Sequence, residues 1–183
     1  MPLRYNGEWH GAHWAVWEIQ EEEQELWALL ASASVEKERL CLIRHPHRRL
    51  QALAARAALQ SLPSAPHFSL SHSYSWAAAI TAPFPVAADI EQRRPFPSHV
   101  WTYFTSFAER QRLHQSYLTE WHFWCAKEVA YKILRSKYDN ISFRRELTFT
   151  GEWVEFHRDS AYHILPISFI EEKEWILAIG RFE

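Results

Sequence analysis

The chain is poor in cysteine and contains no long hydrophobic run. Its two cysteines, Cys41 and Cys125, do not form a CxxC pair, so the sequence predicts neither a disulfide framework nor a thiolate zinc site, and free thiols suit a reducing cytoplasm. The apolar runs fall well short of the ~20 residues that a membrane helix needs. The first residues carry early charges where a signal peptide would have an apolar stretch. We therefore expect a soluble, cytoplasmic protein that does not enter a membrane.

A charge excess of either sign is also missing. The formal net charge is -2, so no global field favours nucleic acid or an anionic membrane, and no basic stripe points to a nucleic-acid-binding module. An anionic ligand would have to be met by a local cluster of positive groups. What the chain does have is a hydrophobic share of 48% with ten tryptophans, which predicts a well-filled core.

Hydrophobic periodicity predicts an α+β protein. Helices precede strands once in each half, which suggests two similar lobes, each a small antiparallel sheet with packed helices. The segment 93–99 contains two prolines and a charge run and predicts the boundary, giving lobes 1–95 and 96–183. The expected elements are a strand at 14–20, helices at 24–30, 34–42 and 48–62, strands at 67–73, 76–82 and 86–92, helices near 98–104, 107–115 and 119–136, and antiparallel strands beyond residue 138.

Two carboxylates lie on the predicted strand 86–92. Asp89 and Glu91 are two apart, so both point to the same face, while Ile90 points to the other. Carboxylates held side by side repel one another unless a cation lies between them, and magnesium prefers such oxygen ligands. By itself, however, this pair is weak evidence, because such spacing more often belongs to a strand face that is exposed to solvent.

A third acidic residue lies in WCAKEVAYK, residues 124–132. Glu128 and Lys132 are four apart on one helix face, with Trp124 a turn earlier. Such a pair is often only a weakly stabilising surface contact. The surrounding run is apolar and aromatic, which leaves a narrow exposed face, so this segment alone leaves both interpretations open.

Two further groups of polar residues could meet phosphates. Ser71, His72 and Ser73 lie at the end of a predicted strand and lack the elbow motif of a serine hydrolase. The basic residues of 44–49, with Arg56 beyond them, could bind phosphate through guanidinium groups. A structural histidine and a solvated helix start would explain the same residues.

The order of these motifs resembles the 4′-phosphopantetheinyl transferase superfamily. SLSHS at 69–73, VAADIE at 86–91 and WCAKEVAYK at 124–132 follow a basic segment, and the spacing is similar to that of the larger, two-lobed, monomeric type. The chain differs from the family pattern at Ala87, where a glycine is usual.

The resemblance implies a role for each matching residue. Magnesium and coenzyme A would bind where the two lobes meet, with two metal ligands from the first lobe and one from the second. The implied metal ligands are Asp89, Glu91 and Glu128; the implied catalytic residues are Glu128 and Lys132; and the implied coenzyme A contacts are Arg49, Arg56, Ser71, His72 and Lys132.

The implied reaction moves phosphopantetheine from coenzyme A to a serine of an acyl or peptidyl carrier protein and releases 3′,5′-ADP. Two alternatives stay open. The chain could be an inactive member of the fold that binds coenzyme A or a carrier protein. It could also be a phosphohydrolase that uses the same three carboxylates.

Overall fold

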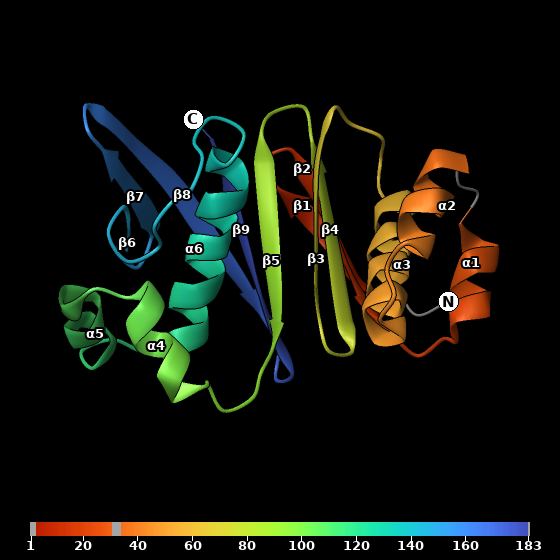
Figure 1. The fold of residues 1–183 in the computed structure, drawn as a ribbon, viewed down its shortest axis with the longest axis horizontal. Coiled ribbons are helices and arrows are strands. Elements are labelled where there is room, and N and C mark those ends of the chain that lie inside the picture. The colour runs from red at the N-terminus through yellow and green to blue at the C-terminus, as the bar shows by residue number, and fades with distance from the viewer. Residues whose placement is uncertain (1–2, 31–33, 183) are drawn as a thin grey trace. The chain divides into compact units, whose positions relative to one another are not determined.

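The computed structural model describes residues 3–30 and 34–182 (Figure 1). Their helices and strands follow the chain in the order β1 Leu3–Trp9, β2 Ala12–Glu18, α1 Glu23–Leu29, α2 Ser34–Cys41, α3 Pro46–Gln60, β3 His67–Ser73, β4 Trp76–Ala82, β5 Val86–Gln92, α4 Ser98–Phe104, α5 Phe107–Leu113, α6 Glu120–Leu134, β6 Leu147–Phe149, β7 Trp153–Arg158, β8 Ala161–Glu171 and β9 Trp175–Arg181. The α+β class is confirmed. No helix within the described residues is long and apolar enough to cross a membrane.

The chain divides into two compact units, Met1–Pro83 and Phe84–Glu183. This differs from the boundary predicted between residues 95 and 96, and the pairing of β5 explains the difference. All of β5 pairs antiparallel with β9, from Val86 opposite Arg181 to Gln92 opposite Trp175. The prolines of 93–99 therefore mark a connection inside unit 2, and the three predicted metal ligands belong to unit 2 alone.

Unit 1 is a four-stranded antiparallel sheet in the order β1-β2-β4-β3, covered by α3. A turn through His10 and Gly11, both with positive φ (47° and 80°), joins β1 to β2. The buried face of α3 is rich in alanine, and it packs against Ala77 and Ala79 of β4. Small residues on both sides allow the helix to lie close to the sheet.

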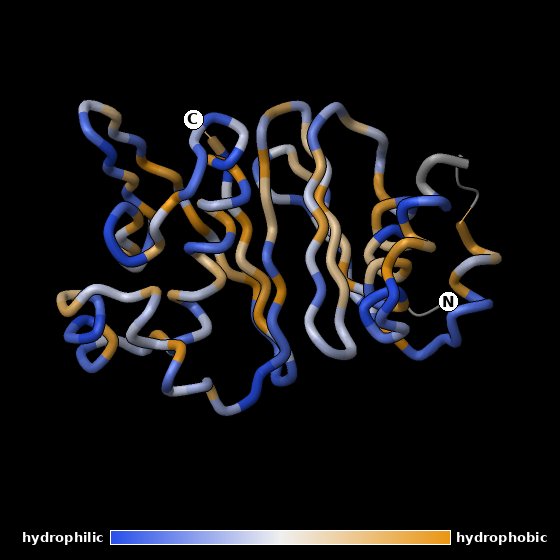
Figure 2. The backbone as a smooth tube through the Cα atoms, in the orientation of Figure 1, coloured by the Kyte–Doolittle hydropathy of each residue, from blue (hydrophilic) through white to orange (hydrophobic). Residues whose placement is uncertain are grey.

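Unit 2 is a five-stranded antiparallel sheet in the order β5-β9-β8-β7-β6, against which α6 packs. Its core combines Val129 and Ala130 of α6 with Ile176 and Ala178 of β9. Gly180 is required at this crossing, because a Cβ there would lie 2.7 Å from Cγ1 of Val129. In Figure 2 the segment after β5 and the β8–β9 turn are hydrophilic, in contrast to the strands that they connect.

The two units share one order of elements. In unit 1, a strand (β2) leads to a 15-residue helix (α3) and then to the hairpin β3–β4, whose last strand pairs with β2. In unit 2, a strand (β5) leads to a 15-residue helix (α6) and later to the hairpin β8–β9, whose last strand pairs with β5. This shared order is compatible with the expectation of two similar lobes.

Candidate metal and phosphate site

The acidic residues of β5 face α6. Asp89 lies opposite Ala178 and Glu91 opposite Ile176 in the β5–β9 ladder. Both of these partners belong to the core that contains α6, and residues opposite one another in a ladder project from the same face. The predicted alternation along 86–92 is therefore confirmed, with Ile90 on the other face.

Lys132 of α6 bonds to Asp89. Its ammonium donates to Oδ1 of Asp89 at 2.8 Å and to the carbonyl oxygen of Ala88 at 2.9 Å. Asp89 is 6% exposed, and the ammonium gives its buried carboxylate a partner of opposite charge. The helix residue predicted to neutralise phosphate charge thus lies beside a predicted metal ligand.

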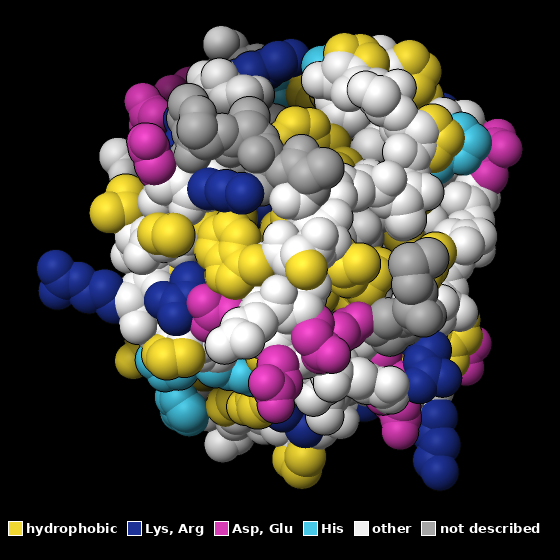
Figure 3. Space-filling model, turned by 90° about the vertical axis from the view of Figure 1, so that its right-hand side faces the viewer, with side chains coloured by type: hydrophobic (Ala, Val, Ile, Leu, Met, Phe, Trp, Pro, Cys, Tyr) yellow, Lys and Arg dark blue, Asp and Glu magenta, His cyan; other side chains and the backbone are white. Residues whose placement is uncertain are grey.

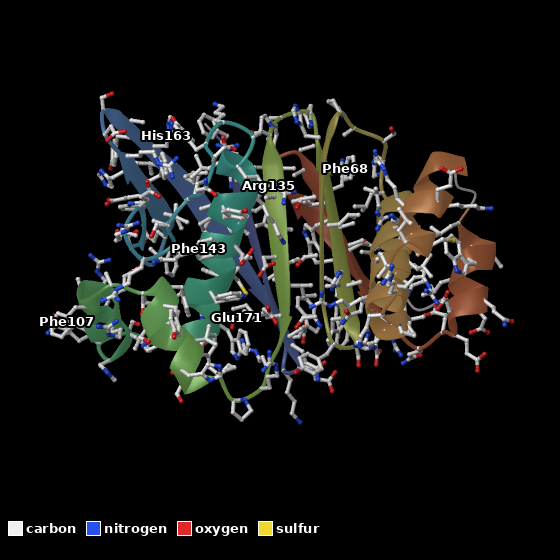
Figure 4. All side chains as sticks on the ribbon, in the orientation of Figure 1. Phe68, Phe107, Arg135, Phe143, His163 and Glu171 are labelled. Atoms are coloured by element: carbon white, nitrogen blue, oxygen red, sulfur yellow. The ribbon has the colours of Figure 1, made fainter. Side chains whose placement is uncertain are left out.

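Glu128 lies one turn before Lys132 and is half-buried. Burial, followed by the negative charge of Asp89, raises its pKa from 4.5 to about 7. Lys132 and Arg135 act in the opposite direction but do not cancel the effect; Figure 4 labels Arg135 toward the far end of α6. Asp89 and Glu128 are therefore close enough for their charges to repel.

Cys125 lies on the same side of α6 and is fully buried. Burial raises the pKa of its thiol, and the charges of Asp89 and Glu91 raise it further. The thiol stays protonated at neutral pH and hydrogen-bonds to the Asp89 side chain. The sequence carried no signal for this contact.

The start of α6 is tied to the end of β5 through Glu171, which Figure 4 labels at the end of β8. Glu171 pairs with Arg93, which directly follows β5, and lies 3.0 Å from Nε2 of His122. Nδ1 of His122 accepts the backbone N–H of Thr119 at 2.9 Å, so the proton on Nε2 is the one shared with Glu171. These contacts hold α6 in position over the acidic strand.

The neighbouring charge, Lys127, points to a different environment. Its ammonium donates to Glu109 at 2.8 Å and to the carbonyl oxygens of Phe104 and Phe143 at 2.7 and 2.8 Å. The side chains of Lys127 and Glu109 are 0% exposed. Glu109 also accepts the backbone N–H of Phe149, so this pair joins α5, α6 and β6 and has a structural role.

Magnesium is compatible with this set of donors. Among the described residues, no three His, Cys, Asp or Glu side chains are gathered closely enough to form a ready-made metal site. Asp89 and Glu128 nevertheless offer two hard oxygen ligands whose mutual repulsion a cation would relieve, and magnesium commonly takes only one or two protein carboxylates. Glu91 is arranged differently, because its Oε1 accepts the indole N–H of Trp124 at 3.1 Å.

The predicted coenzyme A contacts other than Lys132 lie in unit 1. Ser71 is buried and His72 exposed on β3, an edge strand of the sheet. Arg56 donates to the carbonyl oxygen of Ala52. Arg49 is held inside unit 1, since its guanidinium donates twice to Glu23, at 2.6 and 2.9 Å, and once to the carbonyl oxygen of Ile43.

The surface of unit 1 does not concentrate charge of one sign on the side that Figure 3 shows. Basic, acidic and hydrophobic side chains are interspersed there. The ion pair between Arg49 of α3 and Glu23 of α1 is an example of these neighbouring opposite charges. The basic segment 44–49 is thus partly balanced by the acidic start of α1.

The chain was compared with protein-family models and with curated proteins, and neither comparison found a match.

Proposed function

We propose that this protein transfers 4′-phosphopantetheine from coenzyme A to a serine of an acyl or peptidyl carrier protein, in a magnesium-dependent reaction that releases 3′,5′-ADP. The observation that carries the proposal is the approach of Glu128 to Asp89, with Lys132 bonded to Asp89. These residues come from the two motifs, DIE and WxxKExxxK, through which the sequence resembles the phosphopantetheinyl transferases. We propose the two-lobed fold of that family, acting as a monomer in the cytoplasm.

Asp89 and Glu128 would hold the magnesium ion, with Glu91 as the third acidic residue. When bound, magnesium supplies positive charge that offsets the negative pyrophosphate oxygens of coenzyme A. The raised pKa of Glu128 supports this assignment, because it shows that the charged carboxylate is disfavoured in its surroundings. A nearby cation would stabilise that charged form.

Lys132 would neutralise the charge that builds up on the leaving 3′,5′-ADP. It lies on the same helix as Glu128 and already orients its ammonium toward the acidic strand. A fixed positive group costs no reorganisation when charge develops in the transition state. Glu128, on the same face of α6, would accept the proton of the carrier serine.

Unit 1 would bind the nucleotide part of coenzyme A. The resemblance gives this role to Arg49, Arg56, Ser71 and His72. Of these, His72 is exposed on β3, as contact with a phosphate requires, whereas Arg49 already has Glu23 as a partner. The 3′-phosphate could therefore also be met by other basic residues of 44–48.

Mass spectrometry of carrier proteins tests the proposal directly. Purified protein is incubated with magnesium, coenzyme A and several apo acyl and peptidyl carrier proteins. We expect one carrier to gain phosphopantetheine on a single serine, with an equal amount of 3′,5′-ADP released. The same carrier with that serine changed to alanine should gain nothing.

Two results would replace the proposal. Cleavage of coenzyme A without a carrier protein would identify a metal-dependent phosphohydrolase. Binding of coenzyme A without cleavage, and without modification of any carrier, would identify an inactive binding protein.

A further inference from the structure

Trp124 has a fixed orientation on α6. Its indole lies edge-on to Phe104, with ring centroids 5.1 Å apart, and beside Phe143 at 6.2 Å (Phe143 is labelled in Figure 4). The ring is half-buried. Aromatic neighbours on two sides restrict its rotation, so the direction of the N–H group is set by packing.

That N–H group donates to Oε1 of Glu91 at 3.1 Å. Trp124, Glu128 and Lys132 are spaced four residues apart, so they follow one face of α6. Asp89 and Glu91 are two apart on the facing side of β5. Trp124 bonds to Glu91 and Lys132 bonds to Asp89, so each carboxylate of the strand has its own donor on the helix.

The two donors differ in charge. Lys132 brings a positive charge that partly neutralises Asp89, whereas an indole N–H carries no net charge. Trp124 can therefore hold the Glu91 carboxylate in one orientation while leaving its negative charge in place. A neutral donor of this kind fixes a ligand without competing with a cation for it.

We propose that Trp124 is a positioning residue that orients Glu91 toward the magnesium ion. This inference rests on the proposed function of the acidic residues. Partners that hydrogen-bond to metal ligands typically contribute 10–100-fold to metal affinity. The contribution of Trp124 lies in its N–H group and is separate from the packing of its ring.

Trp124→Phe tests this, because phenylalanine keeps an aromatic ring and removes the N–H group. Trp121→Phe is the matched control: Trp121 lies on the same helix, and its indole donates to the carbonyl oxygen of Arg94 at 2.8 Å instead of to a carboxylate. The probe is Mn²⁺, followed by calorimetry and by its electron paramagnetic resonance signal. We expect about tenfold weaker Mn²⁺ binding in Trp124→Phe and an unchanged affinity in Trp121→Phe.

A second measurement needs no metal. In the metal-free protein, the indole N–H resonance of Trp124 should move when Glu91 is changed to glutamine, while that of Trp121 should not. Unchanged Mn²⁺ affinity in Trp124→Phe, or equal losses in both variants, would overturn the inference. If Mn²⁺ binding is unchanged in Trp124→Phe but the wild-type protein still modifies a carrier, only the positioning role fails; if the wild-type protein modifies no carrier, the proposed function fails.

Discussion

Lys127 and Glu128 are adjacent on α6, yet the surroundings of their charged groups differ. The ammonium of Lys127 has three acceptors at 2.7–2.8 Å and a carboxylate partner that is equally buried. The carboxyl group of Glu128 lies near another acid, and its pKa is raised to about 7. A buried charge with a full set of partners is costly to disrupt, whereas a carboxyl group whose charged form is disfavoured is a candidate for a functional site.

The largest expected effect is a loss of transfer activity when the acidic partner of Glu128 is changed. Asp89→Asn keeps the shape of the side chain and removes the charge that, after burial, raises the pKa of Glu128. We expect transfer to fall by on the order of 1,000-fold, as when an electrostatic contact in a transition state is lost. Single-turnover transfer to a carrier protein measures this. Glu174→Gln, at an exposed position, is the control, and near-normal transfer by Asp89→Asn would remove Asp89 from the metal site.

On the structural side, Lys127→Met should destabilise the protein. It leaves Glu109 buried without its cation, a change that typically costs about 3–5 kcal/mol of the free energy of unfolding. Denaturant unfolding measures the loss, and Lys173→Met at an exposed position should show none. A Lys127→Met protein with an unchanged unfolding midpoint would show that the buried pair is not a structural element.

Glu128 should make stability depend on pH. Its pKa in the folded protein, about 7, is above the ordinary value of 4.5. The folded state therefore keeps a proton that the unfolded state loses, so this contribution is complete below pH 4.5 and is lost as the pH rises through 7. The loss is about 3 kcal/mol at most.

The contribution of Glu128 is measured as the free energy of unfolding from pH 5 to pH 8.5, with and without magnesium. The decline in stability should be absent in Glu128→Gln. Magnesium should stabilise the wild-type protein more at high pH, where Glu128 is charged. If the free energy of unfolding declines by the same amount in Glu128→Gln, the pH dependence belongs to another group.

Lys132→Met should reduce transfer less than Asp89→Asn does, and it changes the surroundings of both Asp89 and Glu128. Because Lys132 lowers the pKa of Glu128, its removal should move the pH transition of stability to a higher pH. Transfer should slow by roughly 100-fold through lost stabilisation of phosphate charge, and Lys132→Arg should recover part of it. A rate that does not change would exclude Lys132 from the phosphate site.

The smallest effect is expected at Arg49. Its pair with Glu23 is 24–30% exposed, so Arg49→Ala and Glu23→Gln should each lower the free energy of unfolding only slightly. The affinity for coenzyme A distinguishes the two variants, since we expect weaker binding in Arg49→Ala and unchanged binding in Glu23→Gln. Unchanged affinity in Arg49→Ala would move the 3′-phosphate contact to another basic residue of 44–48.

Local patterns predicted many elements correctly. The strands at 67–73, 76–82 and 86–92 and the helix at 98–104 have the expected bounds, because alternation and proline or serine boundaries are properties of adjacent residues. The strand at 3–9 was missed: β1 is an edge strand with no fully buried residue, so it lacks the hydrophobic alternation that identifies a strand.

The sequence alone determined which residues could form an acidic site. The two-residue spacing of Asp89 and Glu91 and the four-residue spacing of Trp124, Glu128 and Lys132 follow from the geometry of a strand and a helix. Only the tertiary structure decided that β5 pairs with β9 in unit 2, that Trp124 bonds to Glu91 and that Glu23 pairs with Arg49. These contacts join residues 26 or more positions apart, and their partners are selected by burial of the whole core, which no local pattern records.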